Sequence, residues 1–208
     1  MPELQAARGA SLSTSETSGS PGAGEAHGRE GRRSGRSATA LAFGVAALAL
    51  VLDQVSKHLA VRELTGRAPV EVIGSFLQLR LLRNAGAAFS TGESFTPVIS
   101  AIALVATAVI VYFAFRVGHR GWAVALGLLL AGVLGNVLDR IFRAPGPFRG
   151  HVVDFFALPH WPVFNVADIC IDAAGVLFVV LVLRGIHLDG TRHEAGADPG
   201  EARGSRHD

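Results

Sequence analysis

Four long blocks of apolar residues dominate the chain, and most of its polar residues fall between or outside them. The blocks run from about residue 38 to 59, 96 to 117, 122 to 139 and 164 to 183. A helix needs about 20 predominantly apolar residues to cross the hydrocarbon core of a bilayer, at about 1.5 Å per residue. The pattern therefore predicts an all-α membrane protein with four transmembrane helices.

The two long connections, which lie on one side of this arrangement, carry other patterns. Residues 70–82 alternate in part and contain β-branched side chains, which predicts a short strand or hairpin. Residues 84–90 are small and amphipathic, so we expect a short helix on the membrane surface, although a surface turn followed by a short helix fits equally well. Four prolines argue against a helix through residues 141–163. We expect residues 70–82 to form a small extracytoplasmic β region.

Both ends of the chain are poor in large apolar side chains. Residues 1–37 and 185–208 cannot bury enough surface to offset the entropy of ordering, so we expect disordered cytoplasmic tails around a membrane domain at 38–184. Lysines and arginines near the span ends are equal in number on the two sides, so they do not settle the orientation. The arginine cluster at 29–36, directly before the first span, favours cytoplasmic termini.

The composition agrees with a membrane protein and narrows the chemistry. Half of the 208 residues are hydrophobic and 17% are charged, against about a quarter in an ordinary soluble domain. No basic patch with interleaved aromatic residues occurs, so no nucleic-acid partner is predicted. Cys170 is the single cysteine, which excludes an internal disulfide. No histidines or acids have metal-ligand spacing, so we expect no metal and no cofactor.

Two Asn-x-x-Asp units flank the second long connection. Asn136 and Asp139 close the third span, and Asn165 and Asp168 open the fourth. A charged group in hydrocarbon costs about 2.5–3.5 kcal/mol on insertion-based scales, so an acid in a span is expected to be functional. Both aspartates should lie at similar depth near the outer edge of the membrane. Two close carboxylates in a low dielectric share one proton and can activate a water, as in aspartic proteases.

Several other polar residues should reach the same side of the membrane. Asp53 and Lys57 end the first span, Asn84 lies on the first long connection and Arg140 follows Asp139. Simpler interpretations stay open: Asp53 with Lys57 as an ion pair at the interface, and Asp139 as a charge-paired cap. The acids would also suit an ion-coupled transporter or a non-enzymatic scaffold. The polar residues gather on one side and the second span has no acid before its end, which favours an enzyme.

Four motifs, in this order, together resemble the lipoprotein signal peptidase family, bacterial signal peptidase II. They are Asp53-Gln54-x-x-Lys57, Asn84-x-Gly86-x-x-Phe89-Ser90, Gly135-Asn136-x-x-Asp139-Arg140, and Val152-x-Asp154-Phe155 followed by Phe164-Asn165-x-Ala167-Asp168. The resemblance implies an aspartic endopeptidase in the bacterial cytoplasmic membrane. It would remove the signal peptide from diacylglyceryl-modified prolipoproteins by cutting just before the lipidated cysteine, with its active site towards the extracytoplasmic face.

The resemblance also implies roles for single residues. Asp139 and Asp168 would be the catalytic pair, and the residues that bind substrate or support the site would be Asp53, Lys57, Asn84, Gly86, Asn136, Arg140, Asp154 and Asn165. We expect a monomer that works among membrane lipids. Asp172, one turn deeper than Asp168, departs from the family pattern and is either silent or an electrostatic neighbour of Asp168.

Overall fold

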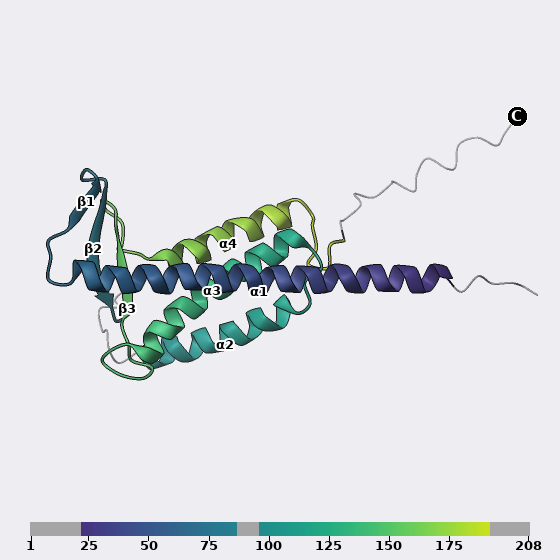
Figure 1. Cartoon of the computed structure of the whole chain (residues 1–208), viewed down its shortest axis with the longest axis horizontal. Helices are drawn as coiled ribbons and strands as arrows, with labels where there is room; N and C mark the ends of the chain where they lie inside the picture. The colour runs from purple at the N-terminus through teal and green to yellow at the C-terminus, as the bar shows by residue number, and fades with distance from the viewer. Residues whose placement is uncertain (1–21, 87–95, 192–208) are drawn as a thin grey trace, which may run out of the picture.

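Four helices lie side by side, and a three-stranded sheet closes one end of the bundle (Figure 1). The structure is a computed structural model, which describes residues 22–86 and 96–191. The helices are α1 (Gly22–Leu64), α2 (Thr96–Ala114), α3 (Arg120–Phe142) and α4 (Val166–Leu183). Each is long and apolar enough to cross a membrane, which confirms the predicted four-span architecture.

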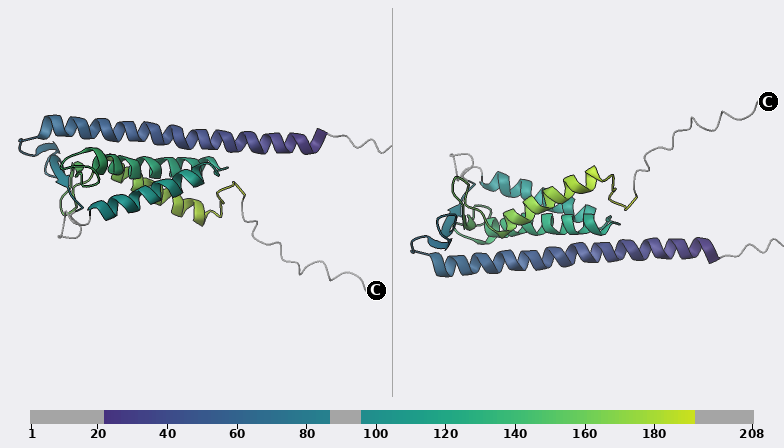
Figure 2. Two further views of the ribbon diagram at one scale, coloured as in Figure 1. Left: turned by 90° about the horizontal axis from the view of Figure 1, so that it is seen from below. Right: turned by 90° about the horizontal axis from the view of Figure 1, so that it is seen from above.

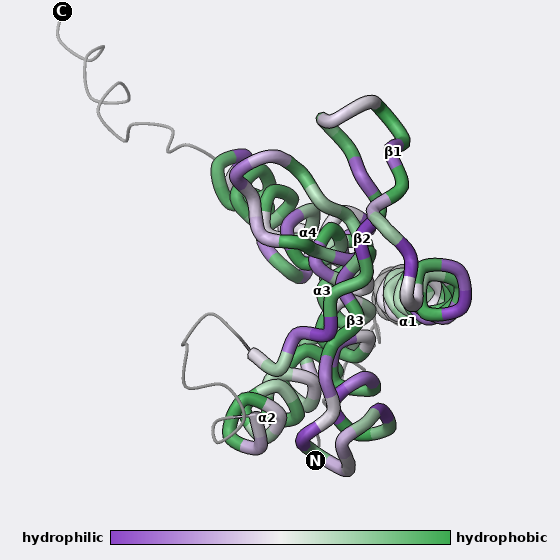
Figure 3. The backbone as a smooth tube through the Cα atoms, turned by 90° about the vertical axis from the view of Figure 1, so that its left-hand side faces the viewer, coloured by the Kyte–Doolittle hydropathy of each residue, from purple (hydrophilic) through white to green (hydrophobic). Residues whose placement is uncertain are grey.

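The small residues of α3 let its neighbours approach closely. α3 lies in the middle and packs against α1, α2 and α4 (Figure 3). A Cβ added to Gly127 would lie 2.5 Å from the Ala42 carbonyl oxygen of α1, and one added to Gly132 would lie 2.5 Å from the Ala167 carbonyl oxygen of α4. Small residues at such contacts are the usual means of packing helices in a membrane. The Ala/Gly-rich third block therefore forms the centre of the bundle.

α1 is longer than the sequence predicted. It begins at Gly22, so residues 22–37 are helical where we expected a disordered tail. Once the apolar span has nucleated a helix, each added residue gains a hydrogen bond without a new nucleation step. In Figure 2 this first part of α1 extends well beyond the other three helices. Residues 1–21 of the expected tail lie outside the described residues.

The start of the predicted C-terminal tail is also ordered. Residues 185–191 fold back against the link between α2 and α3, where the Leu188 carbonyl accepts a hydrogen bond from the Gly118 amide at 2.9 Å. The Trp122 indole donates to the Ile186 carbonyl at 2.9 Å. Ile186 is buried against Leu181. Its apolar side chain explains why this part of the chain packs, and residues 192–208 lie outside the described residues.

The sheet joins the two long connections. β1 (Val70–Ile73) and β2 (Leu77–Asn84) form the predicted hairpin, and β3 (Val152–Ala157) pairs antiparallel with β2. In the register, Asn84 lies opposite Val152 and Leu82 opposite Asp154. Seen from the sheet end, the strands lie across the ends of the helices (Figure 3). The expected surface helix at 84–90 falls largely on residues 87–95, outside the described residues.

The end of α1 anchors the sheet to the bundle. Ala60 and Leu64 of α1 form a buried cluster with Val153 and Phe155 of β3. Side chains alternate along a strand, so burying Val153 and Phe155 against this cluster turns Asp154 to the other face. The fold thereby brings a carboxylate from the second connection to the end of α3 and the start of α4.

Candidate functional site

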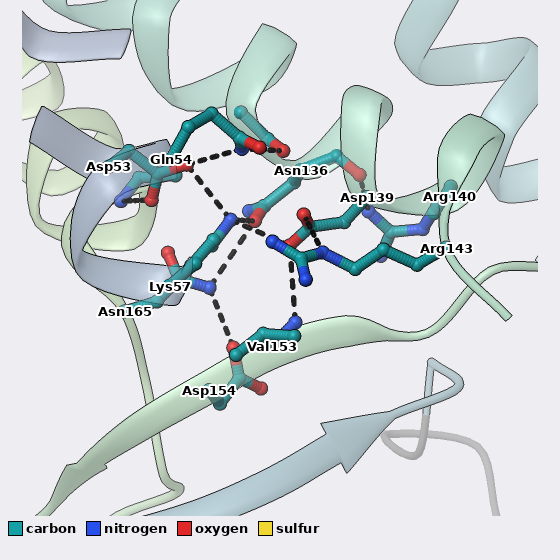
Figure 4. Close-up of polar contacts among 12 residues, drawn as sticks. Asp53, Gln54, Lys57, Asn136, Asp139, Arg140, Arg143, Val153, Asp154 and Asn165 are labelled. Carbon is teal, nitrogen blue, oxygen red and sulfur yellow. Dashed lines mark hydrogen bonds and ion pairs between the residues drawn. The ribbon is translucent and has the colours of Figure 1, made fainter. Parts of the chain in front are cut away.

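A network of polar side chains lies at the sheet end of an otherwise apolar bundle (Figure 4). It gathers residues from five elements, which are α1, β2, α3, β3 and α4. Its members include all but one of the predicted site residues: Asp53, Lys57, Asn84, Asn136, Asp139, Arg140, Asp154, Asn165 and Asp168. The remaining one, Gly86, lies beside the network with a positive φ of 101°, and its amide donates to the Asn84 side chain.

Lys57 is the buried cation of the network. Its ammonium lies 3.0 Å from Asp53 Oδ2 and 2.9 Å from Asp139 Oδ2, and its side chain is 0% exposed. It also donates to Asn136 Oδ1 at 3.0 Å. Three oxygen partners satisfy the three N–H donors of a lysine. Asp53 and Lys57 therefore form the i,i+4 ion pair that one interpretation of the sequence predicted. Lys57 extends this ion pair to Asp139 of α3.

Asp139 is fully occupied by positive and hydrogen-bonding partners. Its Oδ2 accepts from Lys57 and, at 3.1 Å, from the Val153 amide of β3. Its Oδ1 pairs with the Arg143 guanidinium. The residue is 1% exposed. Two cations and a backbone amide therefore occupy both of its carboxylate oxygens. Asp139 therefore links α1, α3 and β3. This arrangement resembles the charge-paired cap that the sequence left open as a simpler interpretation.

Asp53 ties the start of α4 to α1. Its Oδ1 accepts from the Ala167 amide at 2.9 Å. Its other oxygen accepts from Lys57 and from Gln54 Nε2, which also donates to the Gly135 carbonyl of α3. The first turn of a helix has backbone N–H groups without intrahelical partners, and a carboxylate stabilises them. Asp53 thus fixes the helix end that carries Asp168.

Asn165 and Asp168 form a capping box at the start of α4. The Asp168 amide donates to Asn165 Oδ1 and the Asn165 amide donates to Asp168 Oδ2, both at 3.1 Å. Such reciprocal bonds are the standard way to satisfy a helix N-terminus. Asp168 Oδ1 accepts from Asn136 Nδ2 at 2.9 Å. Asp168 stays half-buried, whereas Asp53, Asp139 and Asp154 are buried.

Asp154 of β3 lies next to this capping box. Its Oδ1 accepts from Asn165 Nδ2 at 2.6 Å, and its Oδ2 accepts from Asn84 Nδ2 at 3.0 Å. Burial raises the pKa of Asp154 to about 6, and the charge of Asp168 adds to that rise, while the two amide hydrogen bonds and Lys57 oppose it. Asn165 is therefore a shared partner of two electrostatically coupled carboxyl groups.

Arg140 brings positive charge to the same place. Its Nη1 donates to the Asn136 carbonyl at 3.2 Å, and the charges of Asp139, Asp154 and Asp168 act on it. Its Nε is buried and has no hydrogen-bond partner within the described part of the chain. A buried donor without a partner is costly. This guanidinium therefore has a donor available for a further acceptor at the site.

Sequence reasoning missed two contacts of the network. Arg143 pairs with Asp139 and stands four residues after it, so the i,i+4 rule for helix surfaces is a signal that could have found it. The Val153 amide leaves no comparable signal, because its contact depends on where β3 lies.

Within residues 22–86 and 96–191, no group of three or more His, Cys, Asp or Glu side chains is arranged to hold a metal ion.

Comparison with known proteins agrees with this architecture. The chain is 48% identical over 163 residues to a lipoprotein signal peptidase of Streptomyces coelicolor, covering 78% of this chain and 80% of that one. It is 42% identical over 200 residues to that of Mycolicibacterium smegmatis, covering 92% and 83%. A solved bacterial membrane enzyme superposes with a TM-score of 0.62 at 28% identity, covering 69% of this chain and 92% of that one.

The family model described as Signal peptidase (SPase) II matches residues 45–184. This match contains all four helices, except the first part of α1, together with the sheet and every residue of the polar network. Its members are membrane enzymes that cleave signal peptides. With four membrane-spanning helices and the predicted motifs gathered in one network, the chain belongs to the signal peptidase II family.

Proposed function

We propose that this protein is an aspartic endopeptidase that removes the signal peptide from diacylglyceryl-modified prolipoproteins, cutting just before the lipidated cysteine. Relatives named lipoprotein signal peptidase support the substrate class. The observation that carries the mechanism is the shared contact of Asp154 and Asp168 with Asn165. It couples two carboxyl groups in unlike surroundings, one buried and one half-buried, at the outer end of the bundle.

We propose Asp154 with Asp168 as the acid–base pair, and the pair expected from the sequence, Asp139 with Asp168, stays a prediction that the same assay tests. Both carboxylate oxygens of Asp139 already have partners, which are Lys57, Arg143 and the Val153 amide. Within the described residues, the Asp154 side chain hydrogen-bonds only to neutral amide groups, and its raised pKa favours the protonated form. Pairs of carboxyl groups with unlike surroundings are the usual basis of acid and base roles.

In the proposed reaction, Asp168 is the base and Asp154 the acid. Asp168 takes a proton from a water, whose oxygen bonds to the scissile carbonyl carbon. Asp154 gives its proton to the carbonyl oxygen, so a neutral tetrahedral diol forms. The C–N bond then breaks as the proton held by Asp168 moves to the leaving amine of the lipidated cysteine and a diol proton returns to Asp154. Such general acid–base steps involve no covalent intermediate.

Arg140 and Asn136 would support this reaction. Arg140 Nε has no hydrogen-bond partner among the described residues, and the charges of Asp154 and Asp168 act on this guanidinium, so we expect Nε to donate to a substrate carbonyl near the scissile bond. Asn136 donates to Asp168 and accepts from Lys57, which holds the Asp168 carboxylate in place. Donors fixed before the substrate arrives stabilise charge that develops in the transition state.

The position of the network suits a substrate anchored by lipid. The diacylglycerol stays in the leaflet, so it brings the scissile bond to the depth at which α4 begins. We place this end of the bundle at the extracytoplasmic face and both termini in the cytoplasm, since the arginine cluster at 29–36 precedes the first span. We propose a monomer as the working unit.

Cleavage of a synthetic diacylglyceryl prolipoprotein by the purified enzyme tests the proposal. We expect Asp154→Asn and Asp168→Asn each to lower kcat by about 10²-fold or more, because each removes an acid–base group. Asp139→Asn is the matched control. It should lose thermal stability, and its folded fraction should cleave faster than either of the other two variants.

Two results would overturn this assignment. Normal cleavage by folded Asp154→Asn would remove Asp154 from the pair. A folded Asp139→Asn protein as inactive as Asp168→Asn would return Asp139 to it. A folded wild-type protein that never cuts the diacylated substrate would refute the proposed function itself.

A further inference from the structure

Asp172 lies outside the polar network and inside the span of α4. It is exposed, stands one turn deeper than Asp168 and has no hydrogen bond or ion pair with any residue in the described ranges. A carboxyl group in hydrocarbon is costly, and such residues normally have a partner or face a polar path. The two aspartates lie on one face of α4, because residues four apart in a helix lie one above the other.

That face of α4 is open along the helix. Gly175 continues it, and a Cβ added there would meet nothing within 4 Å. The opposite side is packed: Cys170 is buried with Ala49 of α1 and Ala131 of α3. Asp172 therefore lies on an exposed strip of α4 that begins at Asp168 and continues to Gly175.

A signal peptide undergoing cleavage needs such a strip. Its residues before the scissile bond lead from Asp168 into the membrane, because the lipidated cysteine stays at the outer face. A segment that is extended for cleavage has backbone N–H and C=O groups without helical partners. No water is present in the bilayer core to satisfy them, and each unsatisfied group costs several kcal/mol.

We infer that Asp172 is a specificity-determining residue whose carboxyl group hydrogen-bonds the main chain of the signal peptide just before the cleaved bond. The inference rests on the proposed function. Asp172 is about 6 Å deeper than Asp168, since four helical residues rise about 1.5 Å each. An extended chain advances about 3.3 Å per residue, so the contact falls about two residues before the scissile bond.

The alternative is that Asp172 acts only as an electrostatic neighbour of Asp168. The two roles respond differently to Asp172→Asn and Asp172→Leu. Asparagine keeps hydrogen-bonding groups and loses the charge, whereas leucine loses both. A hydrogen-bonding role predicts that only leucine harms cleavage. An electrostatic role predicts that both variants shift the pH profile of kcat/KM equally.

The test measures kcat/KM for peptides in which one amide N–H at a time is replaced by an ester oxygen. We expect Asp172→Leu to lower kcat/KM about tenfold or more, as for loss of a hydrogen bond to a charged group, and Asp172→Asn to stay within about threefold of wild type. The ester two residues before the scissile bond should lower wild-type kcat/KM to a similar extent. It should have no further effect in Asp172→Leu. Val105→Leu, at an exposed position of α2, is the control and should cleave normally.

Unchanged kcat/KM in Asp172→Leu, or equal pH shifts in both variants without a position-specific ester effect, would overturn the inference. Binding of uncleaved peptide separates this result from a failure of the catalytic proposal. In an Asp168→Asn background, adding Asp172→Leu should weaken binding about tenfold whether or not the pair assignment holds.

Discussion

At the scale of single residues, the ammonium of Lys57 holds carboxylates from two helices, Asp53 at 3.0 Å and Asp139 at 2.9 Å. A buried ion pair adds little net stability over a well-packed apolar core, but removing one partner leaves an uncompensated buried charge. Here the cation has two anionic partners and its side chain is fully buried. The network should therefore be sensitive to loss of this one charge.

Lys57→Met tests that expectation. We expect the variant to lose about 3–5 kcal/mol of unfolding free energy, because Asp53 and Asp139 lose their shared cation inside the protein. Equilibrium unfolding in detergent micelles measures the change. Arg67→Met is the control, since Arg67 pairs with Glu63 at 3.7 Å on the exposed surface and should be almost neutral. Equal stability of the two variants would contradict a central role for Lys57.

Asp154 gives a pH dependence with a definite sign. The proposed acid works only in its protonated form, and burial raises the pKa of Asp154 to about 6. The protonated fraction falls as the pH rises through that value, so kcat/KM should decline on the alkaline side with a midpoint near pH 6. Steady-state cleavage rates between pH 4.5 and 8.5 measure it. A kcat/KM that still rises between pH 6 and pH 8 would argue against Asp154 as the acid.

At the scale of elements, glycines of α3 set the distances on which the network depends. A Cβ added to Gly135 would lie 2.5 Å from Asp53 Oδ2 and 3.1 Å from Ala167 Cβ. The first contact would require the Asp53 carboxylate to move, and the second would require Ala167 to shift by a few tenths of an ångström. Close packing of the helices and the position of Asp53 therefore both require glycine at position 135.

Gly135→Ala should separate these helices and disturb the hydrogen bond from the Ala167 amide to Asp53. We expect lower thermal stability and reduced kcat, since Asp168 follows Ala167 directly. Gly44→Ala is the matched control, because Gly44 of α1 has nothing within 4 Å of an added Cβ. Alanine is about 1 kcal/mol better than glycine in a helix, so this control should be neutral or slightly stabilising. A Gly135→Ala protein as stable as Gly44→Ala would contradict the packing argument.

The pairing of β3 with β2 is the other decisive element contact. Alternation in the sequence predicted the β1–β2 hairpin. For the second connection, the sequence predicted only that no helix runs through it, and no strand was expected there. Residues 77–84 and 152–157 are far apart in the chain, and their register is set by burial of Val153 and Phe155 against α1. Local pattern carries no information about such long-range pairing.

At the scale of the whole molecule, the proposed orientation places the sheet outside and residues 185–191 inside. Single cysteines in a Cys170→Ser background would test it in intact cells. A cysteine at Phe76, exposed in the β1–β2 turn, should react with a membrane-impermeant maleimide without permeabilisation. One at Asp189, in the exposed inner turn, should react only after permeabilisation. The reverse pattern would invert the topology and exclude an extracytoplasmic active site.

The sequence by itself determined the four spans and the end of the bundle at which the polar residues gather. Apolar length sets a span because the hydrocarbon core has a fixed thickness, and alternating spans return every second connection to the same side. It also determined the family motifs, whose residues the structure brings into one network. The structure differs from the expected tails in that α1 begins at Gly22 and Ile186 packs against the bundle, because helix propagation and tertiary packing outweigh polar composition there.

Only the tertiary structure decided how the aspartates are partnered. Asp139 and Asp168 look equivalent as Asn-x-x-Asp units, and Asp154 looks like one acid in a loop. The β2–β3 register instead brings Asp154 to Asn165 and Asn84, while Lys57 and Arg143 occupy Asp139. The proton affinity of a carboxyl group depends on its burial and on the charges around it. Those surroundings arise from contacts between segments distant in sequence, so spacing along the chain could not specify them.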